Sequence, residues 1–375
     1  MKVLQRYFAV EIGRAVIFAL ITLLALFSFF DLMGELSSLN QTNYKFQHAL
    51  LFVALGMPGN VYEFMPIAVL IGTIYVMAQM AASSEFTIMR AASMSSWRAA
   101  GILAKIALGF VIVTFVFGEF VTPWASSTAK NLKLTALGTN VKQNFRTGLW
   151  TKDLVKAPNS DVVIGSRFIN VKEVSPDRSL QGVKIFEFDT NFQLIKEISA
   201  REARFQNNQR WQMSDVAETT YPTSLVDDAM TMAQTEKFPT KELISEITPA
   251  ILSVLFVEPD RMSAYDLAVY KKHLNDNKQD AERYEIAFWK KLTYPFTVMV
   301  MMALALPFAY LQARRGGVSL RIFSGIMLGM LFYLVNSLFS HVGLLNTWPP
   351  LMTAIMPSLL FLILAMLGLR YVERH

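Results

Sequence analysis

Residues 15–30 read AVIFALITLLALFSFF, and this stretch contains no charged residue. The apolar run extends to Met33 when Asp31 lies at a membrane surface, and a helix that spans a bilayer needs about 20 residues. The stretch therefore predicts a transmembrane helix. A cleaved signal peptide is the alternative, but the run is long for one and no small-x-small cleavage site follows it.

Five further apolar stretches predict five more transmembrane helices, so that the spans form two groups of three. The predicted spans cover residues 15–33, 64–82, 99–121, 292–313, 322–340 and 351–369. Composition agrees with a membrane protein, since 53% of the residues are hydrophobic and 17% are charged, against about 25% charged in soluble domains. The chain has no cysteine, which excludes disulfides and cysteine–metal sites.

Basic residues lie on one side of the predicted spans, and short loops rich in Lys and Arg stay in the cytoplasm. The residues on that side are Lys2, Arg6, Arg14, Arg90, Arg98, Arg314, Arg315, Arg321, Arg370 and Arg374. On the other side, residues 37–60 contain only Lys45, and residues 341–350 contain neither Lys nor Arg. This asymmetry predicts cytoplasmic termini and an exported segment between the third and fourth spans.

The exported segment changes from helical to alternating hydrophobic periodicity, which is typical of half-buried strands. Predicted strands are VKIFEF at 183–188, FQLIKEI at 192–198 and RWQMSDV at 210–216, with turns at 189–191 and 206–209. We therefore expect a mostly α membrane protein with an inserted all-β domain, which the pattern leaves open as a sandwich, jelly roll or open barrel. The predicted domains are residues 1–137 with three spans, 138–262 with the strands, and 263–375 with a linker helix capped by Ser263 and three spans.

No motif for covalent chemistry or nucleotide binding is present. The phosphate-binding pattern G-x-x-x-x-G-K-S/T is absent, and the net charge of +6 comes without the basic, aromatic-rich runs of nucleic-acid-binding proteins. The four histidines are isolated, so we expect no metal site and no cofactor. Energy for any transport must come from a partner or a gradient. Four acids lie at the outer ends of spans, where headgroup contact is favoured over a proton relay and a functional role stays open: Asp31, Glu35, Glu63 and Glu119.

Residues 84–96 join spans two and three on the cytoplasmic side. Ser84 as N-cap and Glu85 in the first turn predict a short helix. Its apolar residues Phe86 and Met89, together with Met94, would be exposed unless a partner covers them. These features favour a coupling helix that docks on an ATPase, and a helix lying on the membrane surface stays the alternative.

Several stretches together resemble the LptF/LptG family, the permease subunits of the lipopolysaccharide-export ABC transporter, across essentially the whole chain. They are SEFTIMRAASM at 84–94, GEFVTP at 118–123, GLWTKD at 148–153, QDAERY at 279–284 and SLRIFSGIMLG at 319–329. The G-L-W-x-K-D stretch is similar to the G-type rather than the F-type paralogue. No single motif is decisive, but their order and their places among the six spans are specific.

The resemblance implies a periplasmic β-jelly roll, an F-type permease as heterodimer partner, a cytoplasmic ATPase dimer that binds ATP, and a single-span periplasmic bridge protein. It implies that Glu85 contacts the ATPase, and we expect its neighbours Phe86, Met89 and Arg90 to take part. It also implies that Lys130 and Lys133, which share one helical face, lie near the phosphates of the lipid. The family's basic residues at the outer end of span one are absent here, where Asp31, Ser37 and Ser38 stand instead.

The resulting hypothesis is a permease subunit of the bacterial inner membrane that extracts lipopolysaccharide and passes it to the periplasmic bridge, without catalysing a reaction itself. Acyl chains would contact spans one, two and five, and core packing is the alternative role for each residue chosen there: Phe27, Phe30, Ile67, Phe332 and Leu338. Two other functions stay open. One is a different ABC permease, for lipoprotein release or efflux, and the other is a membrane scaffold or gradient-driven flippase.

Overall fold

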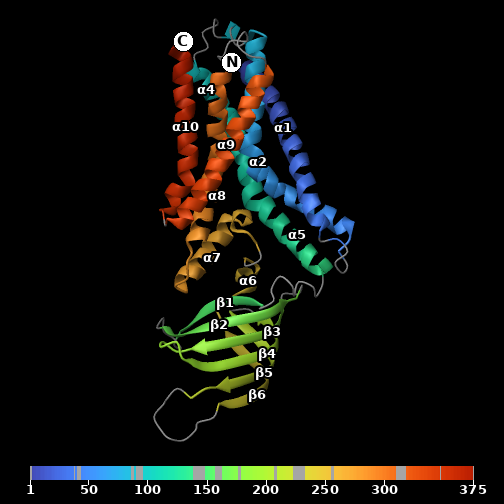
Figure 1. Cartoon of the computed structure of the whole chain (residues 1–375), viewed down its shortest axis with the longest axis vertical. Helices are drawn as coiled ribbons and strands as arrows, with labels where there is room; N and C mark the ends of the chain where they lie inside the picture. Colours follow the sequence, from blue (N-terminus) through green and yellow to red (C-terminus); the bar gives the residue numbers. More distant parts are fainter. Residues whose placement is uncertain are drawn as a thin grey trace.

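Long helices form one end of the molecule and a β-sheet forms the other (Figure 1). This computed structural model describes all residues except 1, 38, 40–43, 86–87, 90–95, 138–147, 157–162, 176–178, 207–208, 223–232, 255–256, 310–317, 347 and 375. Both ends of the chain lie at the end of the helical part that is remote from the sheet (Figure 1). This arrangement is the one expected of an exported domain inserted between the third and fourth spans.

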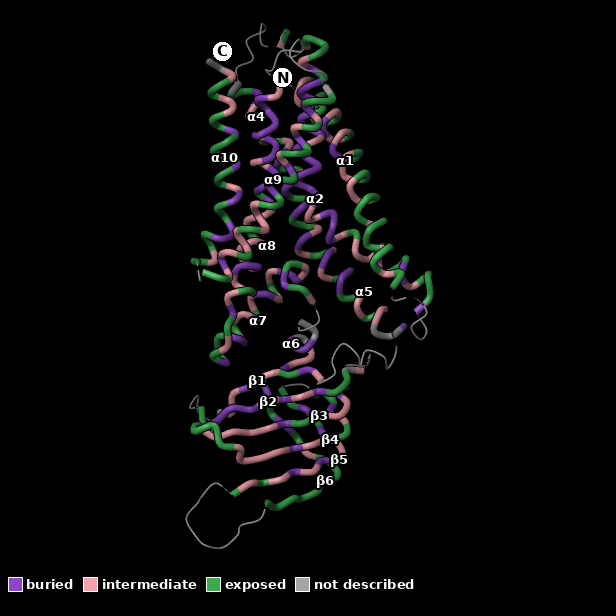
Figure 2. Tube along the Cα trace, viewed as in Figure 1, coloured by how far each residue is buried: buried purple, intermediate pink, exposed green. Residues whose placement is uncertain are grey.

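The prediction of six membrane-length helices is confirmed for the described residues. The helices are α1 (Lys2–Leu36), α2 (Phe46–Ala82), α4 (Ser96–Val116) continued by the π-helix η1 (Phe117–Val121) and α5 (Thr122–Leu137), α8 (Glu282–Ala305) with the 3-10 turn η4 (Leu306–Ala309), α9 (Val318–Leu345) and α10 (Pro350–Arg374). The most buried of the six are α2 and α8, whereas α1 and α9 are the least buried (Figure 2). The last two therefore offer the apolar surface that lipid or a partner would cover.

Two of the spans are much longer than predicted. The spans Phe46–Ala82 and Trp97–Lys133 each contain 37 residues, which corresponds to about 55 Å of helix against a hydrocarbon core of about 30 Å. The extra turns of α2 and α5 lie with the end of α1 and diverge from α8, α9 and α10 (Figure 1). We call the last turns of α1, residues 46–63 of α2 and α5 (Thr122–Leu137) the outer arm. A small buried core around Tyr44, Ala49 and Ala136 holds these segments together.

The inserted domain is all-β, as predicted. Its strands are β1 (Leu149–Lys156), β2 (Val163–Val174), β3 (Leu180–Phe188), β4 (Leu194–Gln206), β5 (Arg210–Thr220) and β6 (Gln234–Ile244). Each pairs with the next in antiparallel fashion, giving one sheet in the order β1 to β6. Three of the strands contain the predicted segments, although Phe192 lies in the turn before β4, with a φ of +58°. Among the described strands the connectivity is therefore a meander.

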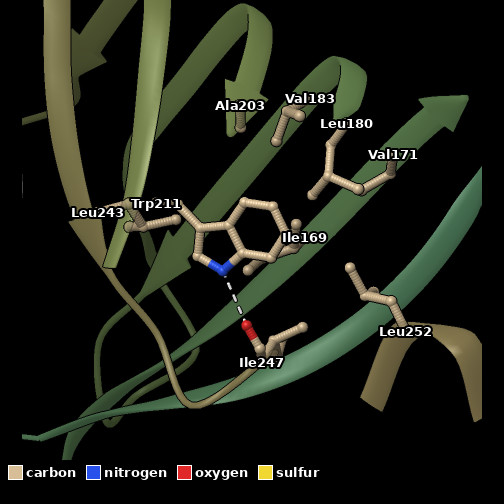
Figure 3. Close-up of a pocket in the computed structure, with 9 residues that line it drawn as sticks. All are labelled: Ile169, Val171, Leu180, Val183, Ala203, Trp211, Leu243, Ile247 and Leu252. Carbon is tan, nitrogen blue, oxygen red and sulfur yellow. Dashed lines mark hydrogen bonds between the residues drawn. The ribbon is translucent and has the colours of Figure 1, made fainter. Parts of the chain in front are cut away.

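The sheet is curved around its own apolar side chains. Ile169 of β2 and Leu243 of β6 line one small pocket together with Trp211 of β5, so the sheet bends its outer strands towards each other. Trp211 fills the centre, and its indole Nε1 donates a hydrogen bond to the carbonyl of Ile247 at 2.8 Å (Figure 3). Leu252 from the short helix α6 (Pro249–Val254) covers the open side of this core.

A linker leads from the sheet back to the helices. It contains α6, the 3-10 turn η3 (Pro259–Arg261) and α7 (Ala264–Asp276). The prediction that Ser263 caps a helix is confirmed, because its hydroxyl accepts the backbone N–H of Asp266 at 3.0 Å. This cap satisfies a donor that would otherwise lack a partner at the helix start.

Candidate functional site

Glu85 lies directly after α2 and is bound by its own chain. The Tyr7 hydroxyl donates to its Oε2 and the Ser83 hydroxyl donates to its Oε1, both at 3.1 Å. The prediction that Ser84 acts as an N-cap is wrong, because its φ of +61° lies far from the extended region that cap residues adopt. A helical turn still starts here, since the N–H of Ile88 donates to the carbonyl of Ser84 at 3.0 Å.

The expectation that Met89 is exposed is also wrong. Met89 packs against the core that contains Phe8 and Met77, whereas its neighbour Ile88 is exposed. Successive side chains on a helix point about 100° apart. An error of one residue in the assumed helix orientation therefore exchanges the exposed position with the packed one. Phe86 and Arg90 lie outside the described residues.

Lys133 is engaged in an ion pair within the outer arm. Its ammonium lies 2.7 and 2.9 Å from the two carboxylate oxygens of Glu35. Tyr44 donates to the same carboxylate at 3.0 Å, and the Lys133 ammonium lies 4.7 Å from the centroid of the Phe52 ring. Burial and the hydrogen bond to Glu35 raise the pKa of Tyr44. The lysine expected at the lipid phosphates is thus already neutralised by an acid from the end of span one.

Lys130 lies one turn earlier on α5, and its environment differs. It is partly buried, and within the described part of the chain no acceptor forms an ion pair or a hydrogen bond with its ammonium. The charges of Glu258 and Arg261 act on it from the linker. The two predicted lysines therefore differ, since only Lys130 has an ammonium without a bonded partner among the described residues.

The other acids at the outer ends of the spans join elements of this chain. Asn60 donates to Asp31 at 3.1 Å and so connects α2 with α1. Glu119 accepts the backbone N–H of Ala264, the first residue of α7, at 2.9 Å. Glu63 is hydrogen-bonded to Tyr333 of α9. These three acids therefore connect the spans and the linker within this chain.

The residues predicted to contact acyl chains fall into two groups. Ile67 and Phe332 are buried core residues, which contradicts a place in an open cavity of this chain. A Cβ added at Gly329 would lie 2.9 Å from Ile67, and Phe332 packs edge-on against Phe361 at 5.1 Å between ring centroids. The remaining three predicted residues are exposed, although the Phe27 ring also packs against Phe64 of α2 at 4.2 Å between centroids: Phe27, Phe30 and Leu338.

A family model described as "Lipopolysaccharide export system permease LptF/LptG" matches residues 6–371. The chain belongs to the LptF/LptG family. It is 28% identical over 362 residues to "Lipopolysaccharide export system permease protein LptG" of Haemophilus influenzae, covering 96% of each chain. It is 29% identical over 367 residues to the protein of the same name from Escherichia coli K12, covering 97% of each chain.

The stretch GLWTKD, one of the five that resemble the family, forms the start of β1 and supplies a buried acid. Asp153 is 1% exposed, accepts a hydrogen bond from Ser245 at 2.6 Å and lies 3.7 Å from the guanidinium of Arg167. Burial raises the pKa of Asp153, whereas the Ser245 hydrogen bond and Arg167 oppose that rise. Arg167 also donates to the carbonyl of Ile244 at 2.9 Å. The motif thus fixes the first strand against the residues that follow the last one.

Proposed function

We propose that this chain is a permease subunit of an ABC transporter that extracts lipopolysaccharide from the inner membrane and passes it to a periplasmic bridge. Membership of the LptF/LptG family over residues 6–371 carries this proposal. The exposed apolar faces of α1 and α9 support it, because they suit a second permease and the lipid between the two chains. In this proposal the chain is a transport subunit and its ATP is hydrolysed by a separate ATPase dimer.

The proposed orientation places both termini in the cytoplasm and the β-sheet in the periplasm. The distribution of Lys and Arg along the sequence supports it. A reporter that works only in the periplasm should be active when fused at Asn208. A reporter that works only in the cytoplasm should be active when fused after Arg315. The reverse pattern would contradict the orientation and every partner assignment that depends on it.

Purification in mild detergent tests the function directly. The chain should bring with it an F-type permease, a cytoplasmic ATPase, a single-span bridge protein and bound lipopolysaccharide, all identified by mass spectrometry. Recovery of an ATPase with lipoproteins or peptides instead would indicate a different ABC permease. Recovery of no ATPase would indicate a scaffold or a gradient-driven flippase.

Glu85 is the proposed contact to the ATPase, and its own hydrogen bonds require a matched control. Glu85→Ala removes the carboxylate, whereas Tyr7→Phe removes only the 3.1 Å hydrogen bond to it. We expect the first variant to lose ATPase recovery or export and the second to keep both. Equal losses in the two variants would assign Glu85 to packing of its own loop, and normal export in Glu85→Ala would return this segment to the membrane-surface alternative.

A further inference from the structure

The helix α7 connects the β domain to the third span. Its residues Leu267, Tyr270 and Leu274 belong to the same buried core as the strands. At the start of the helix, the backbone N–H of Ala264 donates to Glu119 of η1 at 2.9 Å. In the fold, α7 lies between the long helices and the sheet (Figure 1). A change that weakens the packing of α7 therefore also weakens the connection between the sheet and the spans.

His273 lies on the packed face of α7. It follows Tyr270 by three positions, which places both side chains on one side of the helix, and the two ring centroids lie 6.1 Å apart. Tyr270 in turn contacts Tyr284 of α8, with 4.6 Å between ring centroids. Only 6% of His273 is exposed. An imidazole changes its charge near neutral pH, so this packed face contains a group that mild acid can charge.

The hydrogen bonds of His273 fit only the neutral ring. The side-chain nitrogen of Asn277 donates to the carbonyl of His273 at 2.8 Å and lies 3.2 Å from Nδ1 of the ring. An amide nitrogen is a donor only, so Nδ1 accepts and the single proton of the neutral ring is on Nε2. Among the residues that the structure describes, Nε2 has no hydrogen-bond partner.

A second proton on the ring would enter at Nδ1 and face the donor of Asn277. The contact at 3.2 Å would then change from a hydrogen bond to a repulsion between two N–H groups. The positive charge would lie in a buried site where Nε2 also lacks an acceptor within the described part of the chain. Burial without hydrogen bonds strongly disfavours a charged group. In water both nitrogens find acceptors, so protonation favours the state in which α7 has left the core.

The charged groups around His273 do not reverse this preference. Acids act on the ring from β1, from the residues after β6 and from α7 itself: Asp153, Glu246 and Asp276. Asp153 also lies 3.7 Å from the guanidinium of Arg167. On the side of α8, Glu285 is paired with Lys271 at 3.6 Å. Burial lowers the pKa of His273, and the three acids oppose this effect without cancelling it.

We propose that α7 is released from the core of the β domain when His273 is protonated, so that the docking of this helix depends on pH. The inference goes beyond the proposed function, because it does not depend on what the chain transports. The docked state binds fewer protons than the released state, since the docked histidine has the lower pKa. Docking is therefore strongest above about pH 6.5 and weakens as the pH falls from there through the pKa of the docked histidine.

Hydrogen–deuterium exchange of the purified full chain at two pH values tests this proposal. Amides in the second half of α7 report opening of the helix, once their rates are corrected for the intrinsic effect of pH on exchange. Between about pH 7.5 and about pH 5.5, opening of wild-type α7 should rise several-fold, and the ordinary pKa of 6.5 limits this rise to about tenfold. Amides of the central strand β4 are the internal reference and should stay constant.

Three variants separate titration of His273 from a general loss of packing. His273→Gln removes the titrating ring and should make the opening of α7 equal at both pH values. His341→Gln is the matched control, because His341 is an exposed histidine on α9, and it should keep the wild-type rise. In Asn277→Asp the new carboxylate accepts a hydrogen bond from the protonated ring and favours its charged form, so opening should fall instead of rise as the pH falls. The direction of the pH effect is the measurement, so a variant that opens more at both pH values still gives an answer.

Several results would overturn the inference. They are equal opening of wild-type α7 at both pH values, an equal rise in β4, an unchanged rise in His273→Gln or in Asn277→Asp, and loss of the rise in His341→Gln. None of these results bears on the proposed function, which purification of the complex tests separately.

Discussion

Replacing Lys133 by methionine should increase local opening of the outer arm. The ammonium of Lys133 lies within 2.9 Å of both Glu35 oxygens and 4.7 Å from the Phe52 centroid. Methionine keeps the aliphatic stem and removes the charge. Glu35 then keeps the hydrogen bond from Tyr44 and loses both contacts to the Lys133 ammonium. Because the Glu35 side chain is only 14% exposed, water replaces the lost cation poorly.

The expected loss follows from the burial of the pair. Hydrogen bonds to charged groups contribute about 1.5–3 kcal/mol, but the Lys133 side chain is 29% exposed and exposed pairs contribute about 1 kcal/mol or less. A loss of about 1–2 kcal/mol therefore applies, which corresponds to roughly a 5- to 30-fold increase in local opening. The increase should be confined to the outer arm, because the pair joins only the end of α1 to α5.

Hydrogen–deuterium exchange of the amides in the last turns of α1 and α5 measures this opening, because these N–H groups are bonded within the two helices that the pair joins. Lys130→Met is the control, since no described residue forms an ion pair with Lys130, and it should leave the exchange unchanged. The double variant Glu35→Gln with Lys133→Met should exchange less than the two single effects combined, because both remove the same interaction. If Lys133→Met exchanges at wild-type rates and loses crosslinking to lipid, the ion pair does not stabilise the outer arm and Lys133 is a lipid contact.

Two further perturbations test the β domain and the third span. Hydrogen bonds from Lys196 and Lys241 hold the pKa of Glu218 below its ordinary value of 4.5, although burial acts to raise it. The folded state therefore binds fewer protons, so the stabilisation is present above pH 4.5 and is lost as the pH falls through the folded pKa; proteolysis of the Glu218→Gln variant should lack this pH dependence. In Gly118→Val the new Cβ would lie 2.5 Å from Tyr62, so the free energy of unfolding should fall by about 1–3 kcal/mol. Thermal unfolding of the detergent-solubilised protein measures this loss, and an unchanged unfolding midpoint would contradict the packing of Tyr62 on Gly118.

The six spans could be predicted because an apolar stretch of sufficient length has few other places to fold. Their full extent could not, since α2 begins at Phe46, well before the predicted start at 64. The added turns contain polar residues such as Asn60 and lie outside the apolar window that defines a span. Tertiary packing in the outer arm stabilises them as helix, and no local periodicity reports that packing.

The candidate site was predicted less well, because its contacts join distant residues. Lys133 and Glu35 are 98 positions apart, so two lysines on one helical face looked alike in sequence. Apolar identity likewise could not separate Phe332, which is buried, from Leu338, which is exposed.

The family stretch GEFVTP shows how a motif can act through geometry rather than chemistry. Gly118 lies in the π-helix η1, a rare form often found at functional positions, where the Tyr62 ring takes the space of a side chain. Lys291 of α8 lies 4.6 Å from the centroid of the same ring, while Glu119 accepts the first N–H of α7, Ala264. Spans two, three and four and the linker helix thus meet within one turn. A shift of η1 along its axis must either move α7 with it or break this hydrogen bond. Because Leu267 and Tyr270 of α7 belong to the same buried core as the strands, the motif ties the position of the β domain to the third span.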